Sequence, residues 1–132
     1  MIGSVALLAL ALSGEPTPPA KVPLPEGAWG GVHVSLTVTA EGGQLEFDCA
    51  HGSLAERIAP DGSGRFDAAG VFVAERPGPV HQGDEAGGKK ARYSGRVAGD
   101  SMTLSILVEG SDKELGPFTL ERGRLPRLFK CQ

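Results

Sequence analysis

Two segments of the chain carry apolar side chains at every second position, and this alternation limits the fold more than any other feature. In residues 32–38 the apolar positions alternate with His, Ser and Thr, and residues 102–108 repeat the pattern with Thr and Ser. A period of two is that of a β-strand that buries one face. No segment of any length shows the helical period, so the sequence predicts an all-β protein.

Weaker alternations elsewhere bring the number of predicted strands to eight. These strands cover about residues 32–38, 44–49, 54–58, 66–74, 91–97, 102–108, 115–120 and 127–131. The 20 Gly and 10 Pro lie mostly between alternating segments, where they indicate turns. At Gly116-Pro117 the alternation breaks, which predicts a bulge or an edge position. The pattern predicts a small antiparallel up-and-down barrel, with a two-sheet β-sandwich as the alternative.

The length of 132 residues allows one domain behind a leader. We interpret residues 1–13 as a signal peptide or its remnant, because their apolar run is shorter than the ~20 residues that span a bilayer and Ala-Leu-Ser fits a cleavage site. No basic residue precedes the run, which leaves open a true start farther upstream. Residues 14–27 hold five Pro and read as a linker, and residues 28–132 as a single β-barrel domain.

The chain has two cysteines, Cys49 and Cys131. An even number in a small exported chain predicts a disulfide bond, whereas two free thiols in a cytosolic protein are the alternative. A bond that closes so long a loop would contribute about 4 kcal/mol on the chain-entropy model. Together with the leader, it predicts a periplasmic or secreted protein of the cell envelope.

No motif in the chain points to catalysis or to a cofactor. The sequence has neither a G-x-S-x-G elbow nor a Gly-rich phosphate loop. Cys49 and His51 stand two residues apart and could form a nucleophile with its base or two metal ligands, but half of a disulfide beside the last His of a strand is the better interpretation. We therefore expect a protein that is not an enzyme, with no catalytic residue, no bound metal and no cofactor.

The charge and aromatic content argue against some partners. A net charge of -3 and 5% aromatic residues supply neither the basic surface nor the stacking platform of a nucleic-acid protein. Near the C-terminus a local basic cluster could face an anionic ligand or a lipid headgroup, or form a solvated edge. This cluster consists of Arg122, Arg124, Arg127 and Lys130.

The tripeptide Gly27-Ala28-Trp29 resembles the G-x-W opening of lipocalins and of the related avidin-like barrels. The resemblance covers about residues 27–131 and also extends to small exported bacterial β-barrels. It implies that Trp29 packs across one barrel end beneath an Arg from near the last strand, for which Arg122, Arg124 and Arg127 are candidates. The chain lacks the Trp-rich pocket of avidins, so biotin binding is not implied.

These observations predict an exported, non-enzymatic binding protein that holds a small apolar molecule in a barrel. The alternative is a protein-interaction or inhibitor module that acts through the Gly- and Pro-rich loop at residues 76–90. The expected partner is a small molecule or an envelope protein, with no nucleic acid and no integral membrane span, and we expect a monomer. The candidate binding residues are Arg76, His81, Lys89, Lys90 and Tyr93.

Overall fold

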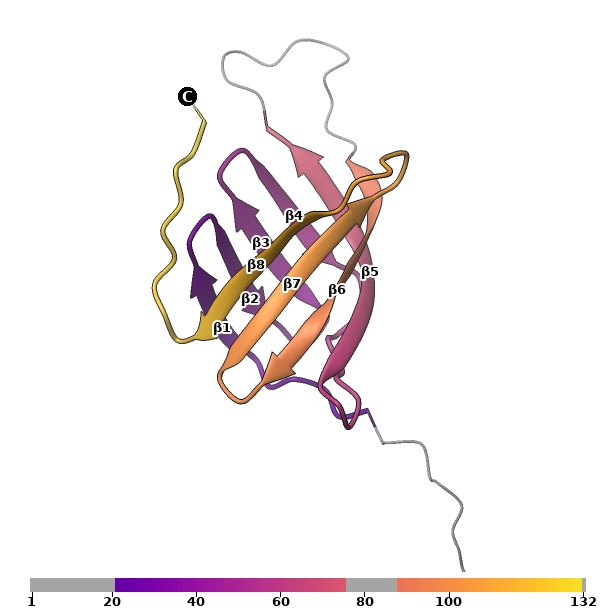
Figure 1. Ribbon diagram of the computed structural model, residues 1–132, viewed down its shortest axis with the longest axis vertical. Coiled ribbons are helices and arrows are strands. Elements are labelled where there is room, and N and C mark those ends of the chain that lie inside the picture. The colour runs from indigo at the N-terminus through magenta and orange to yellow at the C-terminus, as the bar shows by residue number, and fades with distance from the viewer. Residues whose placement is uncertain (1–20, 76–87, 132) are drawn as a thin grey trace, which may run out of the picture.

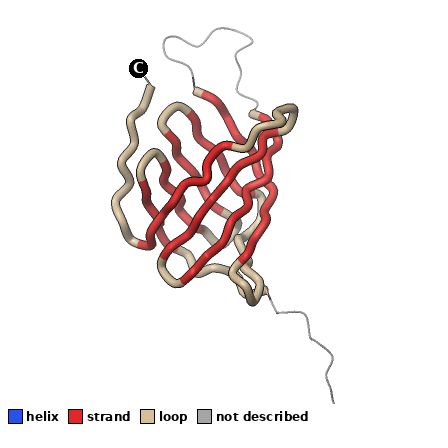
Figure 2. The backbone as a smooth tube through the Cα atoms, viewed as in Figure 1, coloured by secondary structure: helices blue, strands red, loops and turns tan. Residues whose placement is uncertain are grey.

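The computed structural model describes residues 21–75 and 88–131, which form eight antiparallel strands closed into a barrel (Figures 1 and 2). Each strand pairs with the next, and β1 pairs with β8. The strands are β1 (Gly27–Gly31), β2 (Val34–Val38), β3 (Gly43–Phe47), β4 (Ala50–Leu54), β5 (Arg65–Ala74), β6 (Lys89–Ala98), β7 (Ser101–Val108) and β8 (Leu115–Arg122). The predicted up-and-down barrel is therefore confirmed, and the sandwich alternative is wrong.

The number of strands agrees with the prediction, but two of the predicted strands are wrong. The segment 127–131 is not a strand: it is an extended segment with one parallel bridge, between Arg127 and Val32. The predicted strand at 54–58 is instead β4, which lies earlier at Ala50–Leu54 and gives way to a loop. The strand that completes the count of eight is β1, which the alternation of apolar residues did not predict.

Strand β1 escaped notice because its sequence, GAWGG, has only one large side chain. It forms because its backbone pairs on both sides, where Trp29 lies opposite Leu36 of β2 and Arg122 of β8. Strand pairing through the backbone needs no side-chain alternation. This segment is therefore a strand because closure of the barrel pairs it with β2 and β8.

The interior of the barrel is filled by the alternating apolar residues of the strands. The largest fully buried side chains are Trp29, Tyr93, Leu36, Leu45, Ile58, Met102, Leu104, Ile106, Leu120, Val34 and Val38. Eight strands enclose about as much space as such side chains can fill. A ligand therefore has to bind at an end of this core or outside it.

Tyr93 fits across the barrel because small residues face it. A methyl group added at Gly52 would overlap the Tyr93 hydroxyl, and one added at Gly70 would lie 2.9 Å from the Tyr93 ring. The hydroxyl donates a hydrogen bond of 2.7 Å to the carbonyl oxygen of Val71. These two glycines supply the volume that a large central ring needs.

One end of the barrel, the lower end in Figure 1, is covered by the segment that precedes β1. The backbone N–H of Leu24 donates to the carbonyl oxygen of Ile58 at 2.7 Å, and Arg57 donates to the carbonyl oxygen of Leu24 at 2.8 Å. Leu24 and Ile58 are both buried in the core. Part of the predicted linker therefore packs against the barrel.

A bulge in β8 confirms the break predicted at Gly116-Pro117. Leu104 of β7 lies opposite Phe118, whereas Ile106 lies opposite Leu115, so three residues of β8 span two residues of β7. Gly116 has a φ of 102°, which favours glycine. The irregular segment packs closely against Phe118, because a Cβ atom on Gly116 would lie 3.1 Å from the Phe118 ring.

Candidate functional site

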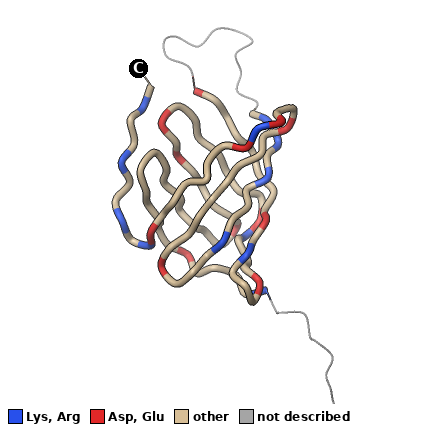
Figure 3. The backbone as a smooth tube through the Cα atoms, viewed as in Figure 1, with Lys and Arg blue, Asp and Glu red and all other residues tan. Residues whose placement is uncertain are grey.

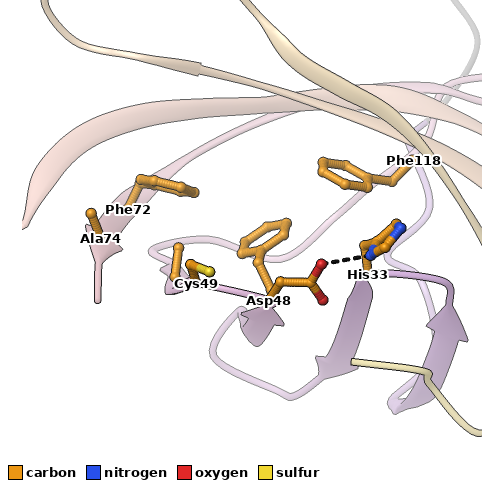
Figure 4. A pocket seen from close by; sticks show the side chains of 8 residues that line it. His33, Asp48, Cys49, Phe72, Ala74 and Phe118 are labelled. Atoms are coloured by element: carbon orange, nitrogen blue, oxygen red, sulfur yellow. Dashed lines mark hydrogen bonds and ion pairs between the residues drawn. The ribbon is translucent and has the colours of Figure 1, made fainter. Parts of the chain in front are cut away.

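The upper mouth of the barrel holds a pocket of about 370 Å³ (Figure 4). It lies above the filled core, at the end that carries the β3–β4 turn and the C-terminus (Figure 1). The lining residues are His33, Phe47, Asp48, Cys49, Ala50, Phe72, Ala74 and Phe118. Its walls are therefore mostly apolar, with polar groups along one side.

Three phenyl rings form the apolar part of the pocket. The ring of Phe47 on β3 lies 5.6 Å from that of Phe72 on β5 and 5.5 Å from that of Phe118 on β8, and both pairs are tilted. Phe47 is buried, whereas Phe72 and Phe118 are only partly buried. Tilted aromatic pairs are favourable, and the accessible parts of these rings offer an apolar ligand a rigid surface.

A His–carboxylate pair forms the polar side. Nδ1 of His33 lies 2.6 Å from Oδ2 of Asp48, and the His33 ring also contacts Phe129, at 5.4 Å between ring centroids. The other carboxylate oxygen of Asp48 accepts the backbone N–H of Phe129 at 2.8 Å. Asp48 therefore fixes both the imidazole and the C-terminal chain at the rim.

A disulfide bond joins Cys49 and Cys131 at this rim, as the sequence predicted, with their Cα atoms 5.1 Å apart. Lys130 adds ion pairs to Glu46 at 3.0 Å and to Glu75 at 2.9 Å. The last residues of the chain are thus held to β3, to the β3–β4 turn and to the end of β5. This bracing fixes one wall of the pocket.

In this structure Cys49 and His51 form neither the nucleophile with its base nor the two metal ligands considered from the sequence. Cys49 lies in the turn between β3 and β4 and has no free thiol, because it is bonded to Cys131. His51 lies on β4, where its Nδ1 is 2.8 Å from Oε2 of Glu75. Within residues 21–75 and 88–131, no three His, Cys, Asp or Glu side chains are grouped so that they could hold a metal ion.

The candidate binding residues from the sequence fall in different places. Arg76 and His81 lie outside the described residues, as does most of the 76–90 loop, so its proposed role stays a prediction. Lys89 and Lys90 are exposed at the start of β6, with Lys89 opposite Phe72. Tyr93 is fully buried, and this burial raises the pKa of its hydroxyl. Tyr93 is therefore a core residue, and its proposed role in binding stays a prediction.

The Arg expected over Trp29 is Arg122, whose guanidinium carbon lies 4.5 Å from the ring centroid. Trp29 and Arg122 are direct cross-strand partners, which explains the stacking. Arg124 instead pairs with Glu121 at 3.5 Å, and the backbone of Arg127 bonds to Gly31. The last strand is β8, which ends at Arg122, so the first of the three Arg candidates is the one that lies opposite Trp29.

Sequence reasoning missed the three Phe and the His33–Asp48 pair as a site. The available signal was that Phe47 and Phe72 occupy apolar-face positions near the ends of predicted strands. Which strand ends meet at one mouth depends on the strand order, which was obscured because β1 was missed and residues 127–131 were predicted as the last strand.

A larger hollow, of about 650 Å³, lies along β5, β6 and β7, and most of its lining side chains are exposed ones. Its side chains include Val71, Lys90, Arg92 and Leu107. Arg92 is already held by Asp67, at 2.6 Å. We place the candidate site at the mouth because that pocket combines aromatic rings from three strands with a fixed polar pair.

Searches of protein-family models, curated proteins and solved structures found no significant match to this chain. The fold itself defines a class, the small closed antiparallel barrels of eight strands, which is compatible with ligand binding. The disulfide hints at an oxidising, extracytoplasmic location. Within the described ranges the structure contains no helix of the length and apolarity needed to cross a membrane.

Proposed function

We propose that this protein is a periplasmic or secreted binding protein that holds a small apolar molecule at the mouth of its barrel. The observation that carries the proposal is the pocket formed by Phe47, Phe72 and Phe118 above a filled core. Its volume of about 370 Å³ falls in the usual range for small-molecule sites, about 300 to 1,000 Å³. The His33–Asp48 pair would orient a polar end of the same molecule.

Two further features support a lipocalin-like mode of binding. Trp29 on the first strand lies beneath an Arg of the last strand, the arrangement that the G-x-W resemblance implies. The rim of the pocket is braced by the Cys49–Cys131 bond and by Lys130, so its walls are fixed before a ligand arrives. Preorganised walls lower the entropic cost of binding.

The proposal includes that the protein does not catalyse a reaction. The supporting observation is that Cys49, which the sequence places near His51, is oxidised to a disulfide, and thiolate is the form of Cys that acts as a nucleophile. A binding role needs only the shape and the apolar surface of the mouth. The ligand we expect is therefore released unchanged.

The test compares two Ala→Trp variants in calorimetric titrations with the amphiphilic probe 1-anilinonaphthalene-8-sulfonate, whose aromatic rings are its apolar part. Ala74→Trp places an indole at the mouth, because Ala74 lines the pocket and is exposed. Ala98→Trp is the matched control, an exposed Ala at the lower end of β6 that does not line the pocket. We expect Ala74→Trp to weaken binding by at least about tenfold, because an indole takes up much of so small a cavity.

The control should bind the probe like the unmodified protein. Equal binding by Ala74→Trp and the unmodified protein, with both variants folded by circular dichroism, would show that the mouth is not the site. Native mass spectrometry of protein from its source, with and without Ala74→Trp, then identifies the natural occupant as a bound mass that the variant loses.

A further inference from the structure

The segment that follows β8, residues 123–131, runs along the outside of the barrel and is called here the C-terminal strap (Figure 1). It carries Arg124, Arg127 and Lys130 and no Asp or Glu, although the whole chain has a net charge of -3 (Figure 3). Lys130 is held by Glu46 and Glu75. Arg124 and Arg127 are exposed, and the ion pair of Arg124 with Glu121 is exposed on both sides and hence weak.

Large apolar side chains are exposed on the same strap. Leu125 is 84% exposed and Phe129 57%, and Val32, which the strap contacts through its bridge at Arg127, is 49% exposed. These are three of the four most exposed large apolar side chains among the described residues. Exposed large apolar side chains grouped on one segment mark a candidate contact surface.

The strap presents these residues on a fixed backbone. The backbone N–H of Arg127 donates to the carbonyl oxygen of Gly31 at 3.0 Å, and that of His33 donates to the carbonyl oxygen of Arg127 at 2.7 Å. The disulfide at Cys131 anchors the far end. Along this segment Leu125, Arg127 and Phe129 are all exposed.

We propose that the strap is a membrane-docking surface that binds the headgroup region of an anionic lipid bilayer. Leu125 and Phe129 enter the boundary between headgroups and acyl chains, while Arg124 and Arg127 contact the phosphates. The charge of the strap is complementary to an anionic bilayer. Its cations alternate with its apolar residues, as the headgroup region requires, and do not surround them. A protein interface more often has an apolar centre inside a polar rim, with anchors in pockets. Neither of the two hollows at the mouth and along β5–β7 is lined by strap residues.

This inference is independent of ligand binding at the mouth and is tested on the full chain by co-sedimentation with vesicles. One vesicle preparation contains equal amounts of phosphatidylglycerol and phosphatidylcholine, and the other contains phosphatidylcholine alone. We expect binding to the anionic vesicles at about 0.1 M salt, and much weaker binding at about 1 M salt, where the Debye length falls from about 10 to about 3 Å. Phosphatidylcholine vesicles should retain little protein.

Two double variants separate the contributions of charge and apolar contact. Arg124→Gln with Arg127→Gln should weaken binding about 25-fold, at about fivefold for each cation near an anionic surface. Leu125→Ser with Phe129→Ser should weaken it by a similar factor, because it removes the apolar insertion. The matched control, Lys90→Gln with Val71→Ser, changes an exposed cation and an exposed apolar residue on β6 and β5 and should bind normally. Far-ultraviolet circular dichroism verifies that each variant is folded.

Three results would overturn the proposal. The first is no binding to the anionic vesicles. The second is an equal loss of binding in the control on β5 and β6. The third is unchanged binding by the Leu125→Ser, Phe129→Ser variant. If the protein bound immobilised polyglutamate but not vesicles, the strap would instead be a surface that binds an acidic protein.

Discussion

Trp29 on the first strand stacks with Arg122 on the last strand. Its ring is 1% exposed, and the guanidinium of Arg122 lies over it at 4.5 Å. Arg122 is held in turn by Asp100, whose Oδ1 accepts from Nε at 3.0 Å. The first strand, the last strand and the β6–β7 turn therefore meet at one aromatic ring. A cation over an indole face adds an electrostatic attraction to the burial of the ring.

Removal of this ring should be costly. We expect Trp29→Ala to lower the free energy of unfolding by about 3 to 5 kcal/mol, the usual cost of deleting a large buried aromatic. Arg122→Gln should cost less, about 1 kcal/mol, because it removes the cation–π contact together with the exposed ion pair to Asp100. Urea unfolding followed by circular dichroism measures both. An unchanged midpoint for Trp29→Ala, with loss of probe binding, would instead make Trp29 a ligand contact.

The fit of Tyr93 against Gly52 can be tested by a double-mutant cycle. Gly52→Ala should destabilise the barrel, since the added methyl overlaps the Tyr93 hydroxyl and lies 2.7 Å from the carbonyl oxygen of Val71. Tyr93→Phe should cost about 1 kcal/mol through the lost hydrogen bond. The double variant should be less destabilised than the sum, because Phe removes part of the overlap. Strict additivity of the two urea-unfolding measurements would show that the methyl and the hydroxyl do not compete.

At the scale of elements, side-chain alternation predicted the strands that bury a regular apolar face. Strands β2, β5, β6 and β7 lie where the pattern placed them, within a few residues. The errors lie in segments whose side-chain alternation does not match their backbone hydrogen bonding. Strand β1 has few side chains to alternate but pairs on both edges, while 127–131 is extended and apolar in part but bonds mainly through Arg127. Side-chain pattern reports burial, and pairing depends on neighbours that are distant in sequence.

The candidate site was harder to predict because it is made by strand ends. Phe47, Phe72 and Phe118 are separated by 25 and 46 residues in sequence, and the fold brings the ring centroids of Phe72 and Phe118 each within 6 Å of that of Phe47. The disulfide was predictable from the count of cysteines, whereas the His33–Asp48 pair required knowledge of which two turns share the upper mouth. Loop 76–90 drew attention by composition, and residues 76–87 of it lie outside the described part of the chain.

The attachment of the strap to the barrel should depend on pH. Hydrogen bonds from Lys130 and then from His51 lower the pKa of Glu75 below its ordinary value of 4.5. A carboxylate with a lowered pKa in the folded state stabilises the protein above its unfolded pKa, and this contribution is lost as the pH falls through the folded pKa. We therefore expect Glu75→Gln to lower stability at pH 7 and to have little effect below the folded pKa.

Urea unfolding of both proteins from pH 7 downwards measures this difference. Glu109→Gln is the matched control, since Glu109 is exposed and lies at the β7–β8 turn. Its stability difference from the unmodified protein should stay nearly constant over the same range. A constant difference for Glu75→Gln as well would show that the Glu75 contacts do not stabilise the fold.

At the scale of the whole molecule, the weakest seam of the barrel is the one that the strap crosses. Strands β1 and β8 share two register pairs, whereas β1 and β2 share five. Beyond this seam the chain continues over β1, bonds to Gly31 and His33, and ends in the disulfide to the β3–β4 turn. The covalent bond therefore links the last part of the chain to the third and fourth strands, across the point of closure.

Loss of this bond should loosen the seam before the rest of the barrel. We expect Cys49→Ala with Cys131→Ala to lower the free energy of unfolding by about 4 kcal/mol, because the bond closes a long loop. Amide hydrogen exchange should then quicken first in β1 and β8, and least in β5, β6 and β7, where the ladders are longest. Lys130→Gln is the control that weakens strap contacts without breaking the covalent closure, and it should leave exchange in β1 nearly unchanged. The unmodified protein should show no free thiol when it is denatured without a reductant. Uniform quickening in all eight strands would mean that the bond stabilises the barrel as a whole, and that closure at β1 and β8 does not depend on the strap.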